Sequence, residues 1–462
     1  MRVAVVGGGV TGLVAARELT GSGREVILLE AADRAGGVVG TVRRDGFLIE
    51  TGPESFVTRK PALLDLCREL GLSAEIVHGE AGRTLVYARG ALRPLPGGFS
   101  LLSTRPGPLL ASGILSPREK ARMALDLVLP PSRIEADASL GLVVGRRLGR
   151  AALDRLVAPL AAGIYGADPD RMSLAATFPE LLEAARRGSL LRRGDRSRGA
   201  DGETRASFAT LRGGLGTLVD RLAGDLKGAG LRTGIRVERV LREGEGWRLE
   251  PRRLDPVHAE RVLLAVPAAE AARILALESP AAARILAGFR RISTAVVTFA
   301  YAAADVGGPE GNGFVVARDA GLPITACTFS SSKWPGRAPE GRALVRVYLG
   351  RADDPLEPGG AGEELIVRAR AGLEAATGWS AAPLFSMLHL ADDSMPQYDV
   401  GHLDRVRELE RALESLPGVA VAGADYRGVG LADCAAQGRA AARRLIGYHG
   451  ARTERDHRPR KE

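Results

Sequence analysis

Three glycines near the start of the chain have the spacing of a nucleotide-binding turn. Gly7, Gly9 and Gly12 follow a short apolar run and precede an apolar stretch with helical character. In a G-x-G-x-x-G turn the first glycine permits the tight turn, the second lets a pyrophosphate approach the backbone, and the third lets helix and strand pack closely. The following helix would offer free N–H groups and its positive dipole end. These residues predict a dinucleotide site.

A carboxylate closes the next apolar run, where the ribose of a dinucleotide would lie. Glu30 can accept hydrogen bonds from both ribose hydroxyls, and its charge would repel the 2′-phosphate of NADP. Arg34 follows, and then Gly36 and Gly37, whose backbone can approach a diphosphate while the arginine adds positive charge. This step resembles the extended motif of flavoprotein oxidases related to the amine oxidases, and the resemblance implies FAD.

A second glycine-rich turn lies near the other end of the chain. Residues 419–423 form a small apolar run ending in Gly423, and Gly428, Val429 and Gly430 then open an alanine-rich helix. In a flavoprotein the N–H groups at such a helix start would face the pyrimidine end of the isoalloxazine and favour the anionic reduced flavin. The alternative is a helix that serves packing only.

The sequence contains no second G-x-G-x-x-G turn between strands. The candidate at Gly213, Gly214 and Gly216 lacks both a preceding apolar strand and the third glycine. Without an NAD(P)H site, a flavin reductase or hydroxylase is disfavoured. Reduced flavin must then pass its electrons elsewhere, and oxygen is the simplest acceptor, so the pattern favours an oxidase or dehydrogenase.

The elements that must position these turns predict an α/β protein with a Rossmann-like FAD-binding domain, a mixed-sheet substrate domain and an inserted helical lobe. We expect a discontinuous FAD-binding domain, a substrate-binding domain, a lobe with possible membrane association as an open alternative, and a disordered tail. Their boundaries are 1–55, 207–270 and 395–447 for the first, 56–99 and 271–394 for the second, 100–206 for the lobe and 448–462 for the tail.

Composition narrows the class of partner. The net charge of +9 suits an acidic partner, but the excess is spread along the chain, aromatic residues are only 4%, and no nucleic-acid-binding motif accompanies it. The three cysteines and six histidines are scattered, so no metal site is expected. No leader segment and no spanning helix are expected, which favours the cytoplasm. The apolar segment 101–130 is expected to be a buried lobe, with peripheral contact at the inner face of the cell membrane as the alternative.

Several stretches, in the same order along residues 3 to 446, resemble the porphyrinogen oxidases of haem biosynthesis, which are relatives of the amine oxidases. The stretches that carry the resemblance are 47–56, 163–168, 173–179, 208–215, 395–402 and 426–434. The family has two substrates, coproporphyrinogen III and protoporphyrinogen IX. The stretch 324–342 and the adjacent cations Arg59 and Lys60 resemble the coproporphyrinogen-oxidising enzymes. One departure is that residues 390–394 lack the aromatic side chain often found near the flavin there.

This resemblance also implies site residues. For FAD these are Gly52, Pro53, Glu54, Ser55 and Val237, in addition to the glycine turns.

For the substrate, Arg59 and Lys60 are candidate partners of the propionates, and Tyr165 and Tyr348 are candidate walls of an apolar pocket. Only five lysines occur among 64 cationic residues, so a lysine at position 60 stands out. A solvated helix-start cation and packing-only tyrosines remain the alternatives.

The reaction that the resemblance implies removes six electrons from a tetrapyrrole in three steps, each moving a hydride to flavin N5, with oxygen as acceptor. No residue is assigned as a catalytic base, because no histidine or lysine is obviously placed for it. Transient contact with ferrochelatase or a membrane surface is a further expectation. The competing functions are a protoporphyrinogen oxidase, an amine oxidase, a carotenoid desaturase, and a catalytically silent FAD-binding protein that contacts membranes or nucleic acid.

Overall fold

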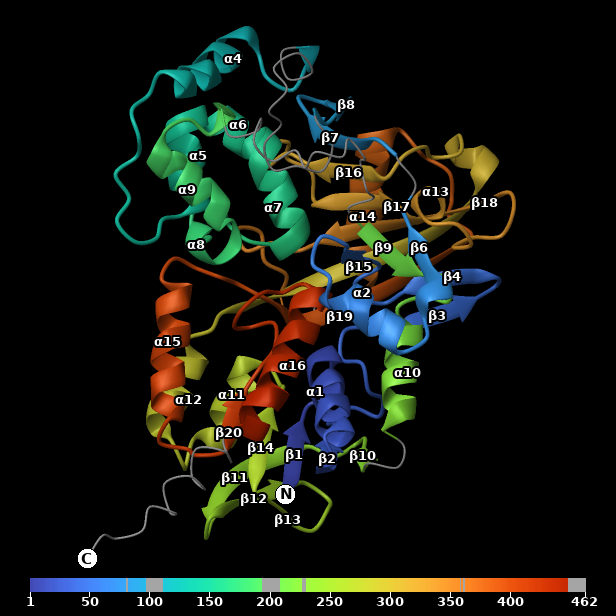
Figure 1. The fold of residues 1–462 in the computed structure, drawn as a ribbon. Helices are drawn as coiled ribbons and strands as arrows, with labels where there is room; N and C mark the ends of the chain where they lie inside the picture. The colour runs from blue at the N-terminus through green and yellow to red at the C-terminus, as the bar shows by residue number, and fades with distance from the viewer. Residues whose placement is uncertain are drawn as a thin grey trace, which may run out of the picture.

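The computed structural model describes residues 1–79, 82–96, 111–192, 208–226, 230–357, 359 and 362–447. The disordered tail expected over 448–462 and the first ten residues of the apolar segment 101–130 lie outside these residues. Figure 1 shows a helical lobe at one end, a large mixed sheet beside it, and a parallel-sheet unit at the other end. The expected α/β class is confirmed.

A parallel sheet forms the base of the molecule. Its strand order is β10-β2-β1-β14-β20, and every neighbouring pair is parallel. The strands are nearly continuous apolar runs because both faces of the sheet are covered. Their bounds are β1 Arg2–Val6, β2 Glu25–Leu29, β10 Leu231–Arg232, β14 Arg261–Leu264 and β20 Val419–Val421.

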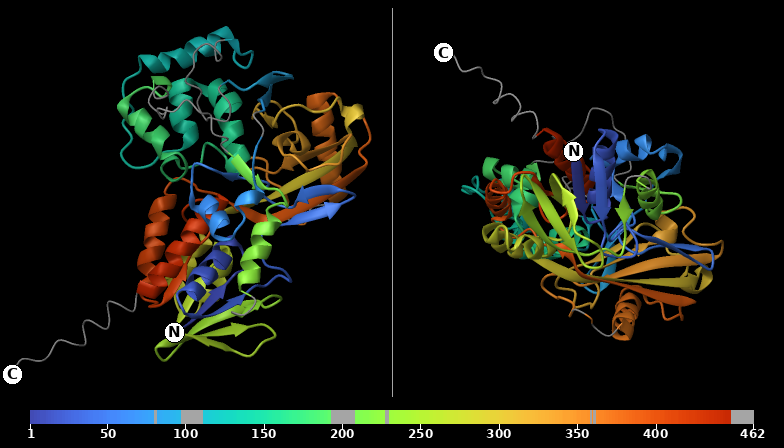
Figure 2. Two further views of the ribbon diagram at one scale, coloured as in Figure 1. Left: turned by 45° about the vertical axis from the view of Figure 1, so that its right-hand side comes forward. Right: turned by 90° about the horizontal axis from the view of Figure 1, so that it is seen from below.

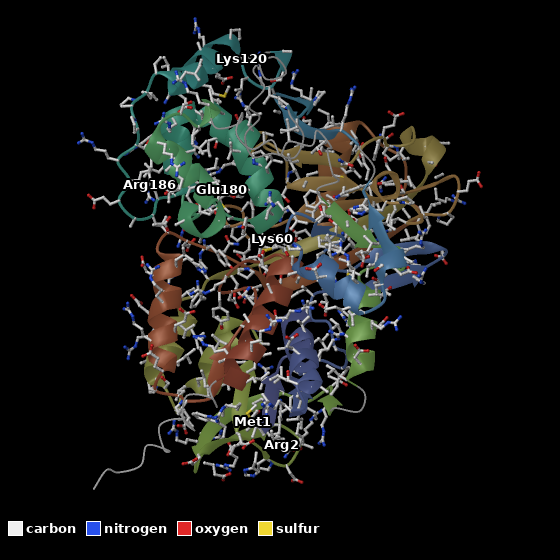
Figure 3. All side chains as sticks on the ribbon, in the orientation of Figure 1. Met1, Arg2, Lys60, Lys120, Glu180 and Arg186 are labelled. Atoms are coloured by element: carbon white, nitrogen blue, oxygen red, sulfur yellow. The ribbon has the colours of Figure 1, made fainter. Side chains whose placement is uncertain are left out.

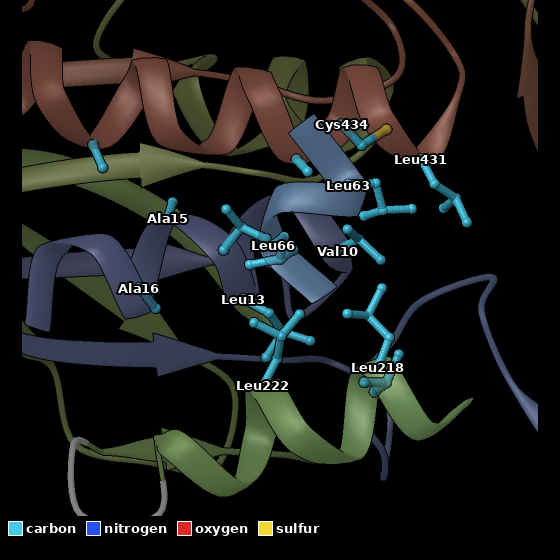
Figure 4. Close-up of a cluster of buried hydrophobic side chains, with 14 of the residues drawn as sticks. Val10, Leu13, Ala15, Ala16, Leu63, Leu66, Leu218, Leu222, Leu431 and Cys434 are labelled. Carbon is cyan, nitrogen blue, oxygen red and sulfur yellow. The ribbon is translucent and has the colours of Figure 1, made fainter. Parts of the chain in front are cut away.

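Two helices pack closely on one face of this sheet. Helix α1 spans Val10–Gly21 and α16 spans Leu431–Gly447. A Cβ at Gly438 would lie 2.4 Å from the carbonyl oxygen of Thr11, so the small residue permits this close approach. Figure 4 shows the apolar cluster between α1, α16, α2 (Ala62–Glu69) and α10 (Gly216–Asp225).

The other face of the parallel sheet is covered by a three-stranded antiparallel sheet and three helices. Trp247 is buried in the cluster between them. The elements are β11 Val237–Glu243, β12 Gly246–Pro251, β13 Val257–Ala259, α11 Ala268–Leu275, α12 Pro280–Ala287 and α15 His402–Leu413.

A seven-stranded mixed sheet lies beside the lobe, in the order β19-β15-β18-β17-β16-β7-β8. Only β16 and β7 pair in parallel. Helix α14 (Gly362–Thr377) covers an apolar face that includes Val297, Phe299 and Val345. The strands are β7 Thr84–Ala88, β8 Ala91–Pro94, β15 Arg291–Ala302, β16 Gly313–Val316, β17 Ala326–Phe329, β18 Arg342–Leu349 and β19 Phe385–Pro396.

Short elements connect the base to this sheet. They are the hairpin β3 Thr41–Arg44 with β4 Phe47–Glu50, the small sheet of β5 Phe56–Val57, β9 Phe208–Leu211 and β6 Ile76–His78, the 3-10 turns Ser73–Glu75 and Ala303–Val306, and α13 Ser330–Lys333.

The helical lobe has its own apolar cluster and stands beside the seven-stranded sheet, as the left view of Figure 2 shows. Serines cap its helices, with a full capping box at Ser116 and caps at Ser139 and Ser173. Within the described residues, no helix is long and apolar enough to cross a membrane. The elements are α4 Pro117–Ala124, a 3-10 turn Leu125–Leu127, α5 Leu140–Leu148, α6 Arg150–Ala152, a π-helical turn Leu153–Val157, α7 Ala158–Tyr165, α8 Leu174–Thr177 and α9 Pro179–Arg187.

Candidate functional site

The first glycine turn has two glycines that the fold needs and one that faces open space. A Cβ at Gly7, whose φ is +102°, would lie 2.4 Å from the Ala265 carbonyl oxygen, and one at Gly12 would lie 1.9 Å from the Gly7 carbonyl oxygen. A Cβ at Gly9 would meet nothing within 4 Å. Gly9 precedes α1, which has no side-chain cap. The open space at Gly9 beside uncapped N–H groups fits a pyrophosphate.

Glu30 is held in place at the end of β2. Its Oε2 accepts from the Gly8 N–H at 2.6 Å, and its Oε1 accepts from the Ala32 N–H at 2.7 Å. Each carboxylate oxygen retains a further lone pair that can accept from a hydroxyl. The Ile235 N–H donates to the Glu30 carbonyl at 2.8 Å, which brings the start of β11 and Val237 to the same end of the sheet.

The Arg34 loop lies against the first glycine turn. The Gly36 N–H donates to the Gly8 carbonyl at 2.8 Å, and a Cβ at Gly37 would lie 3.4 Å from the Gly9 Cα. The Arg34 guanidinium donates to the carbonyls of Gly37 and Val39 at 3.0 and 2.8 Å. Arg34 therefore fixes the shape of the loop, and its contact with a diphosphate stays a prediction.

The second glycine turn is held by a tyrosine. Tyr398 Oη donates to the Ala424 carbonyl at 2.6 Å and accepts from the Gly428 N–H at 2.7 Å. A Cβ at Gly428 would lie 2.5 Å from Asp433 Cγ, whereas one at Gly423 would meet nothing within 4 Å. The loop that leads through Val429 and Gly430 into α16 is therefore tightly packed at Gly428, whereas the space beside Gly423 is empty.

Tyr398 lies in the stretch 395–402, which carries part of the family resemblance, but the sequence alone assigned it no role. Its ring stacks on His402 with centroids 3.8 Å apart, and His402 Nε2 donates to the Tyr426 carbonyl at 2.8 Å. The presence of Tyr398 and His402 in one short stretch, 395–402, just before α15, was the available signal.

The turn at residues 52–55 joins the base to the seven-stranded sheet. A Cβ at Gly52 would lie 1.9 Å from the Val38 carbonyl oxygen, and the Gly52 carbonyl accepts from Arg346 Nη2 at 2.6 Å. Pro53 and Ser55 are half-buried on either side of Glu54. The turn therefore sits between the Arg34 loop and β18.

The Glu54 carboxylate is buried within the sheet domain. It accepts from Ser330 Oγ and Trp334 Nε1, both at 2.8 Å, and pairs with Arg346 at 3.0 Å and Lys333 Nζ at 3.6 Å. Burial alone would raise the pKa of Glu54, but Lys333, Arg346 and the two hydrogen bonds lower it to about 2. The carboxylate of Glu54 is thus fully occupied by contacts with other protein side chains, and its part in binding FAD stays a prediction.

Arg59, Lys60 and Tyr165 are brought together near the start of α16. Lys60 Nζ lies 2.6 Å from Asp433 Oδ1, and Figure 3 shows Lys60 between the lobe and the helices of the base. Burial raises the pKa of Tyr165 to about 12, with Asp433 adding to the rise and Arg59 opposing it, so both charges are near its hydroxyl. The Tyr165 ring is 6.2 Å from that of Tyr398.

Tyr348 reaches the same region from the seven-stranded sheet. Thr328 Oγ1 donates to Tyr348 Oη at 3.3 Å, and the Arg346 guanidinium lies 5.5 Å from the ring. Tyr165 and Tyr348 both pack against the apolar cluster of the lobe. The structure therefore brings both predicted wall residues to the boundary between lobe and sheet.

One titratable side chain on the sheet was absent from the sequence prediction. His389 on β19 lies opposite Val296 on β15, which in turn lies opposite Tyr348 on β18. It is half-buried, and its ring has no hydrogen-bond partner in the part of the chain that the structure describes. No local sequence signal marks it, because its place depends on strand register.

No group of three or more histidine, cysteine, aspartate or glutamate side chains among the described residues is arranged to hold a metal ion. The open space at Gly9, where α1 starts, and the open space at Gly423, in the loop that leads to α16, instead fit an extended dinucleotide.

The comparisons with known proteins agree with this geometry. The family described as flavin containing amine oxidoreductase matches residues 10–446. The coproporphyrinogen III oxidase of Bacillus subtilis (strain 168) is 35% identical, over 96% of this chain and 98% of its own length. That of Propionibacterium freudenreichii subsp. freudenreichii is 37% identical, over 96% and 90%. The chloroplastic protoporphyrinogen oxidase of Nicotiana tabacum is 28% identical, over 93% and 82%.

Solved structures show the same fold. A candidate protoporphyrinogen oxidase from Exiguobacterium sp. 255-15 superposes with a TM-score of 0.86 at 32% identity, covering 96% of this chain and 98% of the other. Reduced UDP-galactopyranose mutase shares the fold with a TM-score of 0.73 at 16% identity, covering 96% and 95%. The chain therefore belongs to the flavin containing amine oxidoreductase family, in the group that includes the coproporphyrinogen III oxidases, and it is an FAD-dependent oxidoreductase.

Proposed function

We propose that this protein oxidises coproporphyrinogen III to coproporphyrin III in haem biosynthesis, with oxygen as the electron acceptor. The observation that carries the choice of substrate is the pair of exposed cations, Arg59 and Lys60, beside Tyr165 and the loop that opens α16. Coproporphyrinogen carries four propionates and protoporphyrinogen two, so more cations at the rim favour the former. The relatives named coproporphyrinogen III oxidase that cover nearly the whole chain support the same choice.

The proposal assigns separate roles to the segments that were expected from the sequence. Segments 1–55, 207–270 and 395–447 act as the FAD-binding unit, and 56–99 with 271–394 act as the substrate-binding unit. The first unit would hold FAD, which when bound would supply the hydride-accepting chemistry for the three two-electron steps.

The chain's own residues orient the macrocycle and exclude water from it. Arg59 and Lys60 bind propionates at the mouth of the site. Tyr165 and Tyr348 press on the apolar ring from the lobe and the sheet, where both side chains are packed against the lobe's cluster. Substrate held in this way keeps one carbon close to the hydride acceptor while its carboxylates stay near solvent.

The main alternative is oxidation of protoporphyrinogen IX, supported by the similarity to the Nicotiana tabacum enzyme. Purified FAD-loaded protein supplied with equal amounts of both porphyrinogens under air distinguishes the two. We expect fluorescent coproporphyrin to form faster, with three hydrogen peroxide per porphyrin. Oxidation of protoporphyrinogen alone overturns the choice of substrate, and porphyrin formation without peroxide overturns the choice of oxygen.

A membrane-facing role for the lobe belongs to the same proposal. Leu125, Leu127, Val128 and Leu129 are exposed, Val128 by 78%. Beneath them the buried Arg147 pairs with Asp126 and donates to the carbonyls of Leu129 and Pro130, which holds these residues in a fixed outward-facing segment.

Exposed arginines lie on the neighbouring segments, at positions 118, 133 and 146. We call residues 125–129 the apolar segment of the lobe. An apolar surface with basic neighbours suits the anionic surface of a membrane. Transient contact with ferrochelatase, which would receive a product leaving this site, is a further part of the proposal.

A further inference from the structure

The register of three strands places His389 on a defined wall. In one row across the sheet, His389 of β19, Val296 of β15 and Tyr348 of β18 are opposite one another. In the next row, Met387, Thr298 and Arg346 are opposite one another. Neighbouring strands are about 4.8 Å apart, so the backbones of His389 and Tyr348 are separated by about 10 Å.

This row belongs to the face of the sheet that α14 does not cover. Side chains alternate between faces along a strand, and the neighbours Val297, Val347 and Leu388 pack towards α14. His389, Val296 and Tyr348 therefore project from the opposite face. Within the described residues, this opposite face also carries Thr294, Thr298, Thr328 and Arg346.

Both proposed binding regions border this face. Arg346, one row away from His389, donates to the Gly52 carbonyl in the turn assigned to FAD. Tyr348, in the same row as His389, packs against the lobe where the macrocycle is proposed to lie. His389 consequently lies on the wall between the turn at residues 52–55 and the proposed substrate pocket, and its half-buried ring has no hydrogen-bond partner among the described residues.

The charges around His389 keep its imidazole neutral. Burial lowers the pKa of His389, and the guanidinium groups of Arg346 on β18 and Arg34 in the loop after β2 lower it further. The other titratable groups facing this wall are Tyr348 on β18 and Glu54, which is bound to Arg346. A neutral imidazole is a proton acceptor at physiological pH.

The other polar and titratable groups on this wall are poorer proton acceptors than His389. Burial raises the pKa of Tyr348, so its phenol stays protonated. Arg346 is a permanent cation. The Glu54 carboxylate, with a pKa of about 2, accepts hydrogen bonds from Ser330 and Trp334 and pairs with Arg346. Among the described titratable residues of this wall, His389 is the one left with a free, neutral acceptor nitrogen.

The proposed reaction needs an acceptor of this kind. When a carbon–hydrogen bond of a porphyrinogen gives up its hydride, the macrocycle gains a positive charge unless a proton leaves as well. Breaking a pyrrole N–H bond leaves its electron pair on the ring, which restores neutrality and completes the new double bond. The departing proton must then form a bond to a base or to water.

We propose that His389 is this base and accepts the pyrrole N–H proton on one of its ring nitrogens, from which the proton passes to solvent. This inference rests on the proposed function. It names a catalytic residue where sequence reasoning named none.

The test uses the FAD-loaded variants His389→Gln and His389→Ala, with His258→Gln as the matched control. His258 is exposed on β13, at the far end of the base, and pairs with Glu243. We expect both His389 variants to retain FAD and to bind the product coproporphyrin, followed by fluorescence quenching, as the wild type does. Their kcat for porphyrinogen should fall by about 10²- to 10⁴-fold, and added imidazole should restore part of the rate of His389→Ala.

The pH dependence supplies a second criterion. Wild-type kcat/KM should fall as the pH drops through the lowered pKa of His389, because the protonated ring cannot accept a proton. The Gln variant should lack that limb, and the ring protons of His389 should titrate in the wild type by NMR below the usual histidine range.

Unchanged kcat in both variants, or loss of FAD from them, overturns the role of His389. Loss of rate without rescue by imidazole also overturns it. A wild-type protein that oxidises neither porphyrinogen overturns the proposed function instead, so the two failures are distinguishable.

Discussion

Lys60 and Asp433 form an ion pair across 373 positions of the chain, with Nζ 2.6 and 2.7 Å from the two carboxylate oxygens. The pair ties the segment after β5 to the first turn of α16. The Lys60 side chain is 47% exposed and that of Asp433 is 18% exposed. A propionate that approaches Lys60 must therefore compete with Asp433 for the ammonium group.

This competition gives opposite predictions for the two partners. Lys60→Ala should raise the KM for coproporphyrinogen about fivefold, equivalent to about 1 kcal/mol for a solvent-screened ion pair. Asp433→Asn should lower the KM, because the ammonium group is then released for the substrate. Initial rates of porphyrin fluorescence at saturating oxygen measure both.

Lys120→Ala on α4 is the matched control for a lysine outside this site, and FAD content is measured for every variant. Equal KM values for Lys60→Ala and the wild type would show that Lys60 does not bind substrate and is only a surface cation at the start of a helix. A rise in KM for Asp433→Asn would mean that Asp433 serves binding directly rather than by restraining Lys60.

Substitutions at two glycines of the first turn should have different effects, one on cofactor binding and the other on folding. Gly9 has a φ of −67°, which alanine adopts freely, and a Cβ there meets nothing within 4 Å. Gly9→Ala should therefore fold but lose FAD, because its methyl group occupies the space for the pyrophosphate. Gly12→Ala should destabilise the protein, because its Cβ would lie 1.9 Å from the Gly7 carbonyl oxygen.

Circular dichroism and the flavin absorbance of the purified proteins measure the two effects. Gly21→Ala, at the end of α1 with nothing within 4 Å of its Cβ, is the control. It should gain up to about 1 kcal/mol in stability and keep its FAD. A yellow Gly9→Ala protein with wild-type FAD content would show that the pyrophosphate does not bind at this turn.

Sequence reasoning was reliable where the pattern is local. The spacing of Gly7, Gly9 and Gly12 depends on a single strand-turn-helix unit. The sequence pattern of residues 140–148 predicts a helix, and α5 has those bounds in the structure. The pattern of residues 151–160 likewise predicts one helix, but in the structure a π-helical turn at Leu153–Val157 divides it. Pro159 in the first turn of α7 lacks an N–H and crowds the carbonyl four residues earlier, which accounts for the break.

The contacts of the site depend on distant segments, and there sequence reasoning was incomplete. It named Lys60 but had no means of finding Asp433, and it placed Glu54 with the flavin residues although its carboxylate is paired inside the sheet domain. His389 was missed because its alignment with Tyr348 is set by the register of β19, β15 and β18. A change of one residue in that register would turn His389 to the other face.

The apolar segment of the lobe gives a prediction for membrane contact. The double variant Leu127→Asp, Val128→Asp should lose at least about tenfold in binding to vesicles that contain anionic lipid, because each apolar side chain contributes about 1.5 kcal/mol or more on burial. Co-sedimentation measures this binding, and high salt should weaken it. Leu277→Asp is the control, since Leu277 is 64% exposed in the base. Equal binding of the two variants would place the membrane contact elsewhere or exclude it.

Glu54 should make stability depend on acid. Its pKa of about 2 lies below the usual 4.5, because Lys333 and Arg346 outweigh the burial that raises it. A carboxylate with a lowered pKa stabilises the fold fully above pH 4.5 and loses that contribution as the pH falls from 4.5 towards 2. Glu54→Gln should cost about 3–5 kcal/mol at neutral pH, since it leaves two buried cations without their counter-charge.

Urea unfolding of the FAD-loaded protein at several pH values measures both effects. The Gln variant should be less stable at neutral pH and should also show a flatter decline between pH 4.5 and 2, because glutamine does not titrate. Glu340→Gln, at an exposed position near the start of β18, should change stability by no more than about 0.5 kcal/mol. If Glu54→Gln changed stability no more than that control does, another group would have to neutralise the buried cations. Glu54 would then no longer be the residue that holds the turn at residues 52–55 to the sheet.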